Sequence, residues 1–225
     1  MMRLGISCGD PNGIGLEVVL KTLAQAEIRE MAQFYLFCSP QVLAYHRNTT
    51  EVGEIPYVTV AAGDTVPKGK IGLVDPWNRE VKVEFGQLNE EGGQAALDSL
   101  SAACAAIEAG QLDGLVTAPL SKANIPSSLE APFTGHTGYL AQRFNAKPLM
   151  VMAAETMRVA LVTEHISLQS VAGRVTPALL DEKLAAFEAA LKLDFGIQRP
   201  TIAVLSINPH AGDGGAMGHE ENDVL

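Results

Sequence analysis

The sequence predicts an α/β protein built around a mostly parallel β-sheet, and two observations support this prediction. Short runs rich in β-branched residues alternate with longer helical stretches along the 225 residues. Hydrophobic residues make up 47% of the chain and charged residues 19%, which provides enough apolar content for a large core. Strands that alternate with helices favour a parallel sheet covered by helices on both faces.

The expected elements follow that alternation. The candidate strands are the short apolar runs 4–8, 34–38, 57–60, 71–74, 114–117, 149–152, 159–163 and 202–207. The candidate helices are 15–29, 93–109, 137–145 and 177–192. The last helix has the best start, because Thr176 is a good N-cap and Pro177 suits the first helical position. The stretch 52–88 is richer in proline and glycine, and it is either an antiparallel insertion or the lobe of a second domain.

Composition excludes several classes of protein. The net charge of −10 argues against nucleic acid as a partner, because phosphate backbones require a basic surface. The N-terminal residues lack the apolar segment of a secretory signal, and no run approaches the roughly 18 apolar residues of a membrane span. The three cysteines, Cys8, Cys38 and Cys104, follow no disulfide or metal-binding pattern. We therefore expect a cytoplasmic protein with no membrane partner.

Four of the apolar runs end in polar loops, and a ligand site is expected there. The loops 9–15, 118–122, 164–165 and 208–215 follow the candidate strands 4–8, 114–117, 159–163 and 202–207. Ligand clefts of open parallel sheets lie at the carboxyl ends of the strands. We therefore expect these loops to converge on one site.

Two of these loops have alternative interpretations. The 9–15 turn, Gly-Asp-Pro-Asn-Gly-Ile-Gly, leads into a helix whose free N–H groups would favour an anion. Its glycine spacing differs from the dinucleotide-binding fingerprint, and Asp10 places a negative charge there, so an ordinary tight turn is the alternative. In the loop 118–122, Lys122 either contacts a phosphate or carboxylate or is a solvated loop lysine.

The segment 133–138 opens the predicted helix 137–145 and combines His136 with two threonines and two glycines. In one interpretation Thr134 or Thr137 caps the helix and His136 is a surface residue. In the other, the exposed N–H groups of the helix start and His136 contact an anionic substrate. The concentration of these residue types favours substrate contact.

Two histidines form the strongest candidate for a metal site. His165 and His210 each lie just beyond a predicted strand, in a polar loop. Two neutral imidazoles from separate loops suit Zn²⁺, Co²⁺ or a similar ion, and ordinary loop histidines are the alternative. A catalytic zinc normally takes three protein ligands, so the pair is incomplete. His219 is a candidate third ligand, although its acidic neighbours fit a solvated helix start equally well, and His46 carries no functional signal.

Taken together, the segments 9–15, 117–122, 133–137 and 208–215 resemble the signatures of the 4-hydroxythreonine-4-phosphate dehydrogenase family, in the family's order. The resemblance implies a fold like that of the isocitrate and isopropylmalate dehydrogenases, with two α/β lobes, discontinuous in sequence, and a cleft between them. It also implies a homodimer whose active sites draw residues from both subunits.

The reaction that the resemblance implies is the NAD- or NADP-dependent oxidation of 4-phosphooxy-L-threonine. Decarboxylation then gives 3-amino-2-oxopropyl phosphate in vitamin B6 (pyridoxal phosphate) biosynthesis. By position, His165 and His210 match metal ligands for zinc, magnesium or cobalt, and His136 and Thr137 match substrate-binding residues. A divalent metal would favour loss of the alcohol's proton and would stabilise the enolate that decarboxylation leaves. No catalytic or cofactor-binding residue is assigned.

The resemblance also predicts a chain that is shortened at its C-terminus, with an incomplete second lobe. Family members continue past Leu225 and there supply a third metal histidine, further phosphate-binding side chains and much of the cofactor site. We therefore expect the 225 residues to bind metal weakly and to have little dehydrogenase activity. Two alternatives are a dehydrogenase of D-threonate or D-erythronate 4-phosphate, and an inactive fragment that binds a phosphorylated ligand or a metal.

Overall fold

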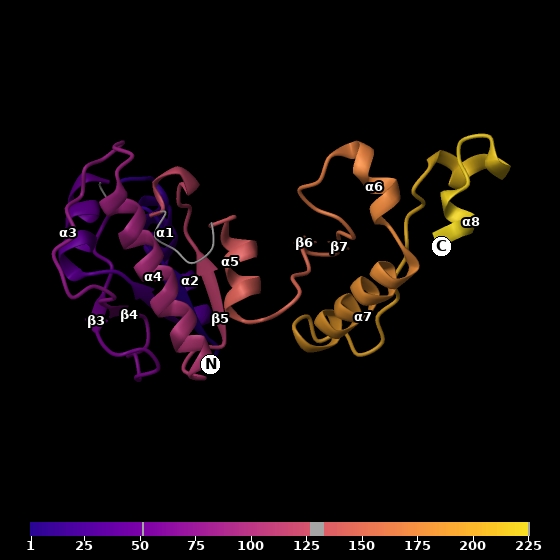
Figure 1. Ribbon diagram of the computed structural model, residues 1–225. Helices are drawn as coiled ribbons and strands as arrows, with labels where there is room; N and C mark the ends of the chain where they lie inside the picture. The colour runs from indigo at the N-terminus through magenta and orange to yellow at the C-terminus, as the bar shows by residue number, and fades with distance from the viewer. Residues whose placement is uncertain (51, 127–132, 225) are drawn as a thin grey trace. The chain divides into compact units, whose positions relative to one another are not determined.

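A computed structural model describes residues 1–50, 52–126 and 133–224, and it divides into two compact units (Figure 1). The first unit is Met1–Ala146 and the second is Lys147–Leu225. Among the described residues, every helix is too short or too polar to cross a membrane. Whether the two units correspond to the two discontinuous lobes implied by the resemblance stays a prediction.

A sheet of five parallel strands forms the centre of the first unit. The strands lie in the order β3-β4-β2-β1-β5, and every neighbouring pair is parallel. Their bounds are β1 Arg3–Ser7, β2 Gln33–Phe37, β3 Tyr57–Thr59, β4 Ile71–Val74 and β5 Gly114–Thr117. The prediction of an α/β fold with a mostly parallel sheet is confirmed. Since parallel strands end at the same edge of a sheet, the loops after β1 and β5 begin side by side there.

Local sequence explains where the helices of the first unit begin. Ser39 caps the third helix by accepting a hydrogen bond from Val42 N–H, and Asn89 caps the fourth in the same way from Gly92 N–H. The bounds are α1 Gly15–Leu23, α2 Ala26–Met31, α3 Pro40–Thr49, α4 Glu90–Glu108, the 3₁₀ helix η1 Lys122–Asn124, and α5 His136–Arg143.

Two features of these helices differ from the prediction. The predicted helix 15–29 is two helices, because the backbone becomes extended at Gln25. The prediction lacks α3, since only three of its ten residues are buried.

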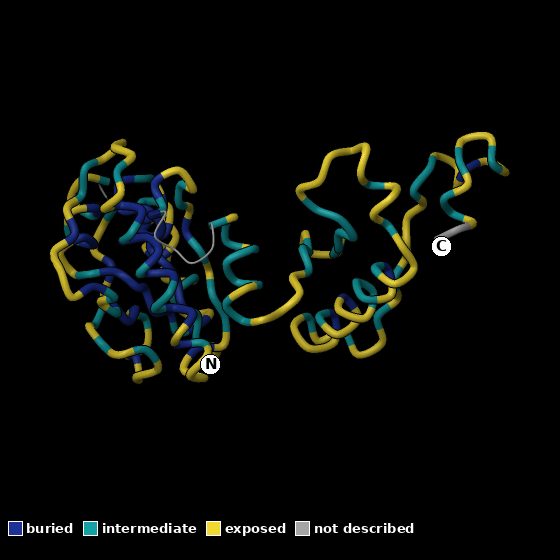
Figure 2. The backbone as a smooth tube through the Cα atoms, viewed as in Figure 1, coloured by how far each residue is buried: buried dark blue, intermediate teal, exposed yellow. Residues whose placement is uncertain are grey.

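The sheet is buried on both faces, and β2 shows this most clearly. Its side chains alternate between two apolar clusters, as the period of a strand requires. Phe34 and Leu36 belong to the cluster that contains residues of α1 and α3, whereas Tyr35 and Phe37 belong to the cluster that contains residues of α4. Figure 2 shows the buried backbone of the first unit concentrated in the sheet and in α4. This two-sided burial explains why the strand runs read as continuously apolar.

The stretch 52–88 is part of this sheet. β3 and β4 lie within it and pair in parallel with one another, and β4 also pairs with β2. Ile71 and Leu73 are fully buried in the main apolar cluster, which Trp77 and Val81 also join. Both predictions for this stretch, an antiparallel insertion and a second lobe, are therefore wrong.

The second unit contains a hairpin and several helices. Its strands β6 Val151–Ala153 and β7 Arg158–Ala160 pair antiparallel. Its helices are α6 Leu168–Arg174, α7 Pro177–Leu193, the 3₁₀ helix η2 Pro209–Gly215 and α8 Glu220–Val224. The predicted start of α7 is confirmed, because Thr176 Oγ1 accepts a hydrogen bond from Leu179 N–H at 3.2 Å and Pro177 is in the first turn.

The predicted strand 202–207 has no regular structure in the second unit. Val204 and Leu205 are exposed, and no strand in the described part of the chain pairs with this segment. A strand is stabilised by the neighbour that takes its backbone hydrogen bonds, so an apolar run alone does not form one. The strand prediction is wrong for this segment.

Candidate functional site

The glycine-rich turn after β1 contains a buried carboxylate, Asp10, which is 7% exposed. Its Oδ1 accepts a hydrogen bond from Asn12 N–H at 2.8 Å, and its Oδ2 accepts one from Asn124 Nδ2 at 2.8 Å. The N–H of Asp10 itself donates to the Pro119 carbonyl at 3.1 Å. Asp10 is therefore hydrogen-bonded to both ends of the segment 119–124, which follows β5.

These contacts favour the tight-turn interpretation of residues 9–15. The Asn12 N–H, which a bound anion would need, already donates to the Asp10 carboxylate. Gly9 has a φ of 68°, and a Cβ added there would collide with the Pro119 carbonyl oxygen, so glycine is required for both conformation and close approach. A pyrophosphate would meet a buried negative charge in this turn, and the turn does not fit one.

A network of polar side chains extends from the same turn. Asn12 Oδ1 accepts from Glu84 N–H at 2.7 Å, and Asn12 Nδ2 donates to Asn89 Oδ1 at 3.0 Å. Asn89 Oδ1 also accepts from Gly92 N–H at 2.8 Å, which caps α4. The sequence interpretation missed these residues. The residues Asn-Glu-Glu at 89–91 were an available signal, because they combine an N-cap with an acidic first turn.

Lys122 reaches the first turn of α5. A Cβ added at Gly135 would lie 3.2 Å from Lys122 Nζ and 3.0 Å from Lys122 Cε, so the end of the lysine side chain lies against this glycine. Gly135 is the N-cap of α5 and has a φ of 118°, a conformation that favours glycine. The structure thereby brings together two segments that the sequence singled out separately, 118–122 and 133–138.

His136 and Thr137 are the first two residues of α5. The N-cap is Gly135, without a side-chain hydrogen bond, so the interpretation in which Thr134 or Thr137 caps the helix is wrong. A glycine with positive φ occupies that position instead. The N–H groups of the first turn have no acceptor within the helix and carry the positive end of its dipole.

The His136 imidazole is partly buried beside this helix start. It packs edge-on against Phe133, with 6.3 Å between the ring centroids. Its Nε2 is buried and has no hydrogen-bond partner among the described residues. Burial lowers the pKa of His136, which favours the neutral imidazole. A neutral ring with an unused nitrogen therefore lies at the start of α5.

His46, which carried no signal in the sequence, is fully buried against the turn after β1. Its Nε2 donates to the Pro11 carbonyl at 2.8 Å, and its ring packs edge-on against Phe85 with 4.9 Å between centroids. Burial lowers the pKa of His46, whereas the Pro11 carbonyl and the charge of Glu17 raise it by less. His46 is thus a structural contact of the turn.

The predicted metal ligands belong to the second unit. His165 follows β7 and His210 lies in η2; both are exposed and have positive φ, of 51° and 54°. The His219 ring lies against Gly215, where an added Cβ would collide with it. In residues 1–50, 52–126 and 133–224, no three His, Cys, Asp or Glu side chains are grouped so that they could hold a metal ion. Metal binding by His165 and His210 stays a prediction, and so does the convergence of the four loops, which belong to both units.

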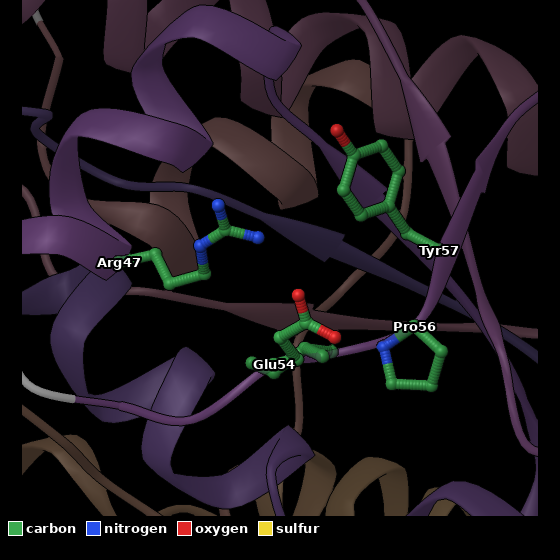
Figure 3. Close-up of a pocket in the computed structure, with 5 residues that line it drawn as sticks. Arg47, Glu54, Pro56 and Tyr57 are labelled. Carbon is green, nitrogen blue, oxygen red and sulfur yellow. The ribbon is translucent and has the colours of Figure 1, made fainter.

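A pocket of about 390 Å³ lies at the edge of the sheet opposite to the loops that follow β1 and β5 (Figure 3). Arg47, Glu54, Pro56 and Tyr57 line it, together with Ile55. Arg47 is near the end of α3 and Tyr57 begins β3, so the pocket is at the amino ends of the parallel strands. It is therefore separate from the loops that follow β1 and β5.

Comparison with known proteins identifies the family. Residues 30–225 match the model of the family described as pyridoxal phosphate biosynthetic protein PdxA. A relative from Bacteroides thetaiotaomicron, named 4-hydroxythreonine-4-phosphate dehydrogenase, is 42% identical over 226 residues, which cover 100% of this chain and 62% of the relative. A relative of the same name from Citrobacter koseri is 36% identical over 229 residues, which cover 100% of this chain and 68% of the relative.

Solved structures agree with this match. A 4-hydroxythreonine-4-phosphate dehydrogenase from Burkholderia phymatum superposes with a TM-score of 0.87 at 29% identity, covering 100% of this chain and 68% of that one. The enzyme of the same name from Klebsiella pneumoniae also gives 0.87, at 25% identity, covering 100% of this chain and 69% of that one. The chain thus spans between 62% and 69% of the length of these four proteins. It belongs to the family of the pyridoxal phosphate biosynthetic protein PdxA.

Proposed function

We propose that this protein acts in the oxidation and decarboxylation of 4-phosphooxy-L-threonine to 3-amino-2-oxopropyl phosphate, in vitamin B6 biosynthesis. The observation that carries the proposal is the family match over residues 30–225, with relatives named 4-hydroxythreonine-4-phosphate dehydrogenase. The proposal includes a fold like that of the isocitrate and isopropylmalate dehydrogenases. It also includes a cytoplasmic homodimer with shared active sites.

In this proposal the start of α5 binds the substrate's phosphate. His136 and Thr137 supply N–H groups of the first turn, and Thr137 adds an exposed hydroxyl. The Lys122 side chain against Gly135 adds a positive charge at the same place. Binding the phosphate there fixes the substrate's orientation at a distance from the reacting carbon, which lowers the entropic part of the barrier.

The two predicted metal ligands are of a suitable type for a divalent metal, but they are fewer than the three protein ligands that a catalytic zinc normally takes. His165 and His210 carry exposed imidazoles, the ligands that zinc and cobalt favour, and magnesium is a weaker match to them. We propose both as ligands, and a divalent ion held there would polarise the substrate's hydroxyl. NAD or NADP is the proposed hydride acceptor, and we assign no residue to it because the turn at 9–15 does not fit a pyrophosphate.

The test is an assay of NADH or NADPH formation by the protein as its gene encodes it. Three substrates are compared with added Zn²⁺, Mg²⁺ or Co²⁺: 4-phosphooxy-L-threonine, D-threonate 4-phosphate and D-erythronate 4-phosphate. The proposal expects the highest kcat/KM with 4-phosphooxy-L-threonine. A higher value with either sugar-acid phosphate would reassign the substrate, and no turnover with any of the three would indicate a ligand-binding protein.

A further inference from the structure

Asn124 is a buried amide at the end of the segment that carries Lys122. It is the last residue of η1 and is 7% exposed. Its Nδ2 donates to Asp10 Oδ2 at 2.8 Å and to the Asn89 carbonyl at 3.0 Å. One side chain therefore joins this segment to the turn after β1 and to the start of α4.

The other end of the segment is held by the same aspartate. The N–H of Asp10 donates to the Pro119 carbonyl at 3.1 Å, while its carboxylate accepts from Asn124. Residues 119–124 therefore form an arch that is fixed to Asp10 at both ends, and Lys122 lies on this arch.

Two glycines allow the ends of the arch to approach neighbouring backbone. A Cβ added at Gly9 would collide with the Pro119 carbonyl oxygen, and one added at Gly93 in α4 would collide with the Asn124 carbonyl oxygen. Close backbone approach of this kind requires glycine. The arch thus packs closely at both ends, and its middle carries the side chain that reaches α5.

We propose that Asn124 is a positioning residue, which holds Lys122 against Gly135 at the start of α5 through its hydrogen bonds to Asp10 and Asn89. The inference rests on the proposed function, in which this helix start binds the substrate's phosphate. Asparagine suits the role because its one amide group donates both to the buried Asp10 carboxylate and to the partly buried Asn89 carbonyl. An aspartate at this position has no donor to offer and places a second carboxylate beside Asp10.

The position of Lys122 is tested first, without a ligand, by NMR. The nuclear Overhauser effect between the Lys122 ε-protons and the Gly135 α-protons is expected in the wild type and lost in Asn124→Asp. It is expected to return, at least in part, in the exchanged pair Asp10→Asn/Asn124→Asp, where the new amide at position 10 donates to the new carboxylate at 124. Asn48→Asp adds the same charge at an exposed asparagine and serves as the matched control.

The consequence for binding is tested with inorganic phosphate, followed through the amide resonances of His136 and Thr137. Lys122→Ala is expected to weaken binding about 10-fold or more, as for the loss of a charge-assisted hydrogen bond. Asn124→Ser removes the bridging amide without adding charge. As a single substitution, with Lys122 present, it is expected to weaken the binding of inorganic phosphate. In the Lys122→Ala background it should have no further effect. Asn124→Ser also replaces Asn124→Asp in the first experiment if the charged variant does not fold.

The outcomes separate this inference from the proposed function. An undiminished Overhauser effect between Lys122 and Gly135 in Asn124→Asp overturns the inference. It is also overturned if Asn124→Ser weakens phosphate binding by the same factor with Lys122 present and in the Lys122→Ala protein. If the Overhauser effect is lost and returns as expected, but phosphate shifts no resonance of α5, the positioning role stands and the proposed phosphate site fails.

Discussion

At the scale of single residues, Gly135 has a backbone conformation that L-residues rarely adopt. Its φ of 118° strains any L-residue, and an added Cβ would lie 3.0 Å from Lys122 Cε, so the end of this flexible side chain would have to shift slightly. We expect Gly135→Ala to lower the free energy of unfolding by about 1–3 kcal/mol, the typical cost of such strain. Urea titration measures it. Gly53→Ala is the control, since Gly53 has no neighbour within 4 Å of an added Cβ and no positive φ. Equal effects of the two substitutions would contradict the argument.

Thr137 gives the most direct test of the substrate assignment. Removing its hydroxyl in Thr137→Ala deletes a hydrogen bond to an anion, which is typically worth about 1.5–3 kcal/mol. We therefore expect the Michaelis constant for the phosphorylated substrate to rise about 10-fold or more. Thr137→Ser keeps the hydroxyl and should stay near the wild-type value. An unchanged Michaelis constant in Thr137→Ala would remove Thr137 from the proposed site.

The cysteines are buried, and their chemistry follows from that burial. Burial raises the pKa of Cys8 to about 12 and raises the pKa of Cys38 as well, so little thiolate is present at neutral pH. We expect neither thiol to react with 5,5′-dithiobis(2-nitrobenzoate) at pH 8 until the protein unfolds, whereas the denatured chain should release one equivalent per cysteine. Rapid labelling of native Cys8, located by mass spectrometry, would show that the strand end opens.

At the scale of elements, α7 depends on its first turn. Thr176 Oγ1 accepts from Leu179 N–H, and few residues of the helix are buried: Leu180, Phe187 and Leu191. We expect Thr176→Ala to destabilise α7 by about 1 kcal/mol, the usual value for a lost N-cap. Amide hydrogen exchange within 177–193 is the measurement, and Thr176→Ser, which retains the acceptor, is the control. Exchange rates in Thr176→Ala that match those of Thr176→Ser would contradict it.

The elements that could be predicted from sequence are those whose signals are local. The strands near Leu4, Phe34 and Ile71 can be predicted because each is a short apolar run, and each contributes side chains to the main apolar cluster. The run 202–207 is also a short apolar run, but it pairs with no described strand. A local pattern does not predict this, because pairing depends on a partner strand that is distant in the sequence. For the same reason, the parallel pairing of β3 and β4 was not visible in the stretch 52–88.

The candidate site shows the same division between local and distant information. Lys122 and His136 were identified because they follow a strand end and open a helix, both of which are local features. The bond between Asp10 and Asn124 joins residues 114 positions apart, and nothing in either segment indicates the other. Sequence reasoning therefore found Lys122 and His136 and missed Asn124, the buried amide that connects their surroundings to Asp10.

At the scale of the molecule, two imidazoles make the first unit sensitive to acid. His46 is fully buried with Nδ1 unpaired among the described residues, and His136 has a buried Nε2 without a partner. Burial lowers the pKa of both side chains below the roughly 6.5 of an unfolded histidine. Protonation of either ring in the folded protein would create a buried N–H donor that has no acceptor.

The sign of the pH dependence follows from these lowered pKa values. Well above about pH 6.5 both rings are neutral in the folded and unfolded chains, so they contribute no pH dependence there. As the pH falls below that value, the unfolded chain binds protons that the folded chain excludes, and the free energy of unfolding decreases. The slope reaches at most about 1.4 kcal/mol per pH unit for each histidine.

Asp113 and Glu108 affect stability at lower pH than the histidines do. Hydrogen bonds from Arg3 and Arg143 lower the pKa values of these two carboxyl groups, and the stabilisation is lost only below about pH 4.5.

His46→Gln isolates one of the two contributions. Glutamine offers an N–H donor to the Pro11 carbonyl in place of Nε2 and does not titrate. We expect the variant to be less stable at pH 7.5, because the packing of the ring against Phe85 is lost, and to lose less stability than the wild type between pH 6.5 and 5. Urea titrations at half-unit pH intervals measure both quantities, with His219→Gln as an exposed control. A slope in His46→Gln equal to that of the wild type would mean that the folded protein binds a proton at His46 as readily as the unfolded chain does, and that the turn after β1 tolerates a charged imidazole.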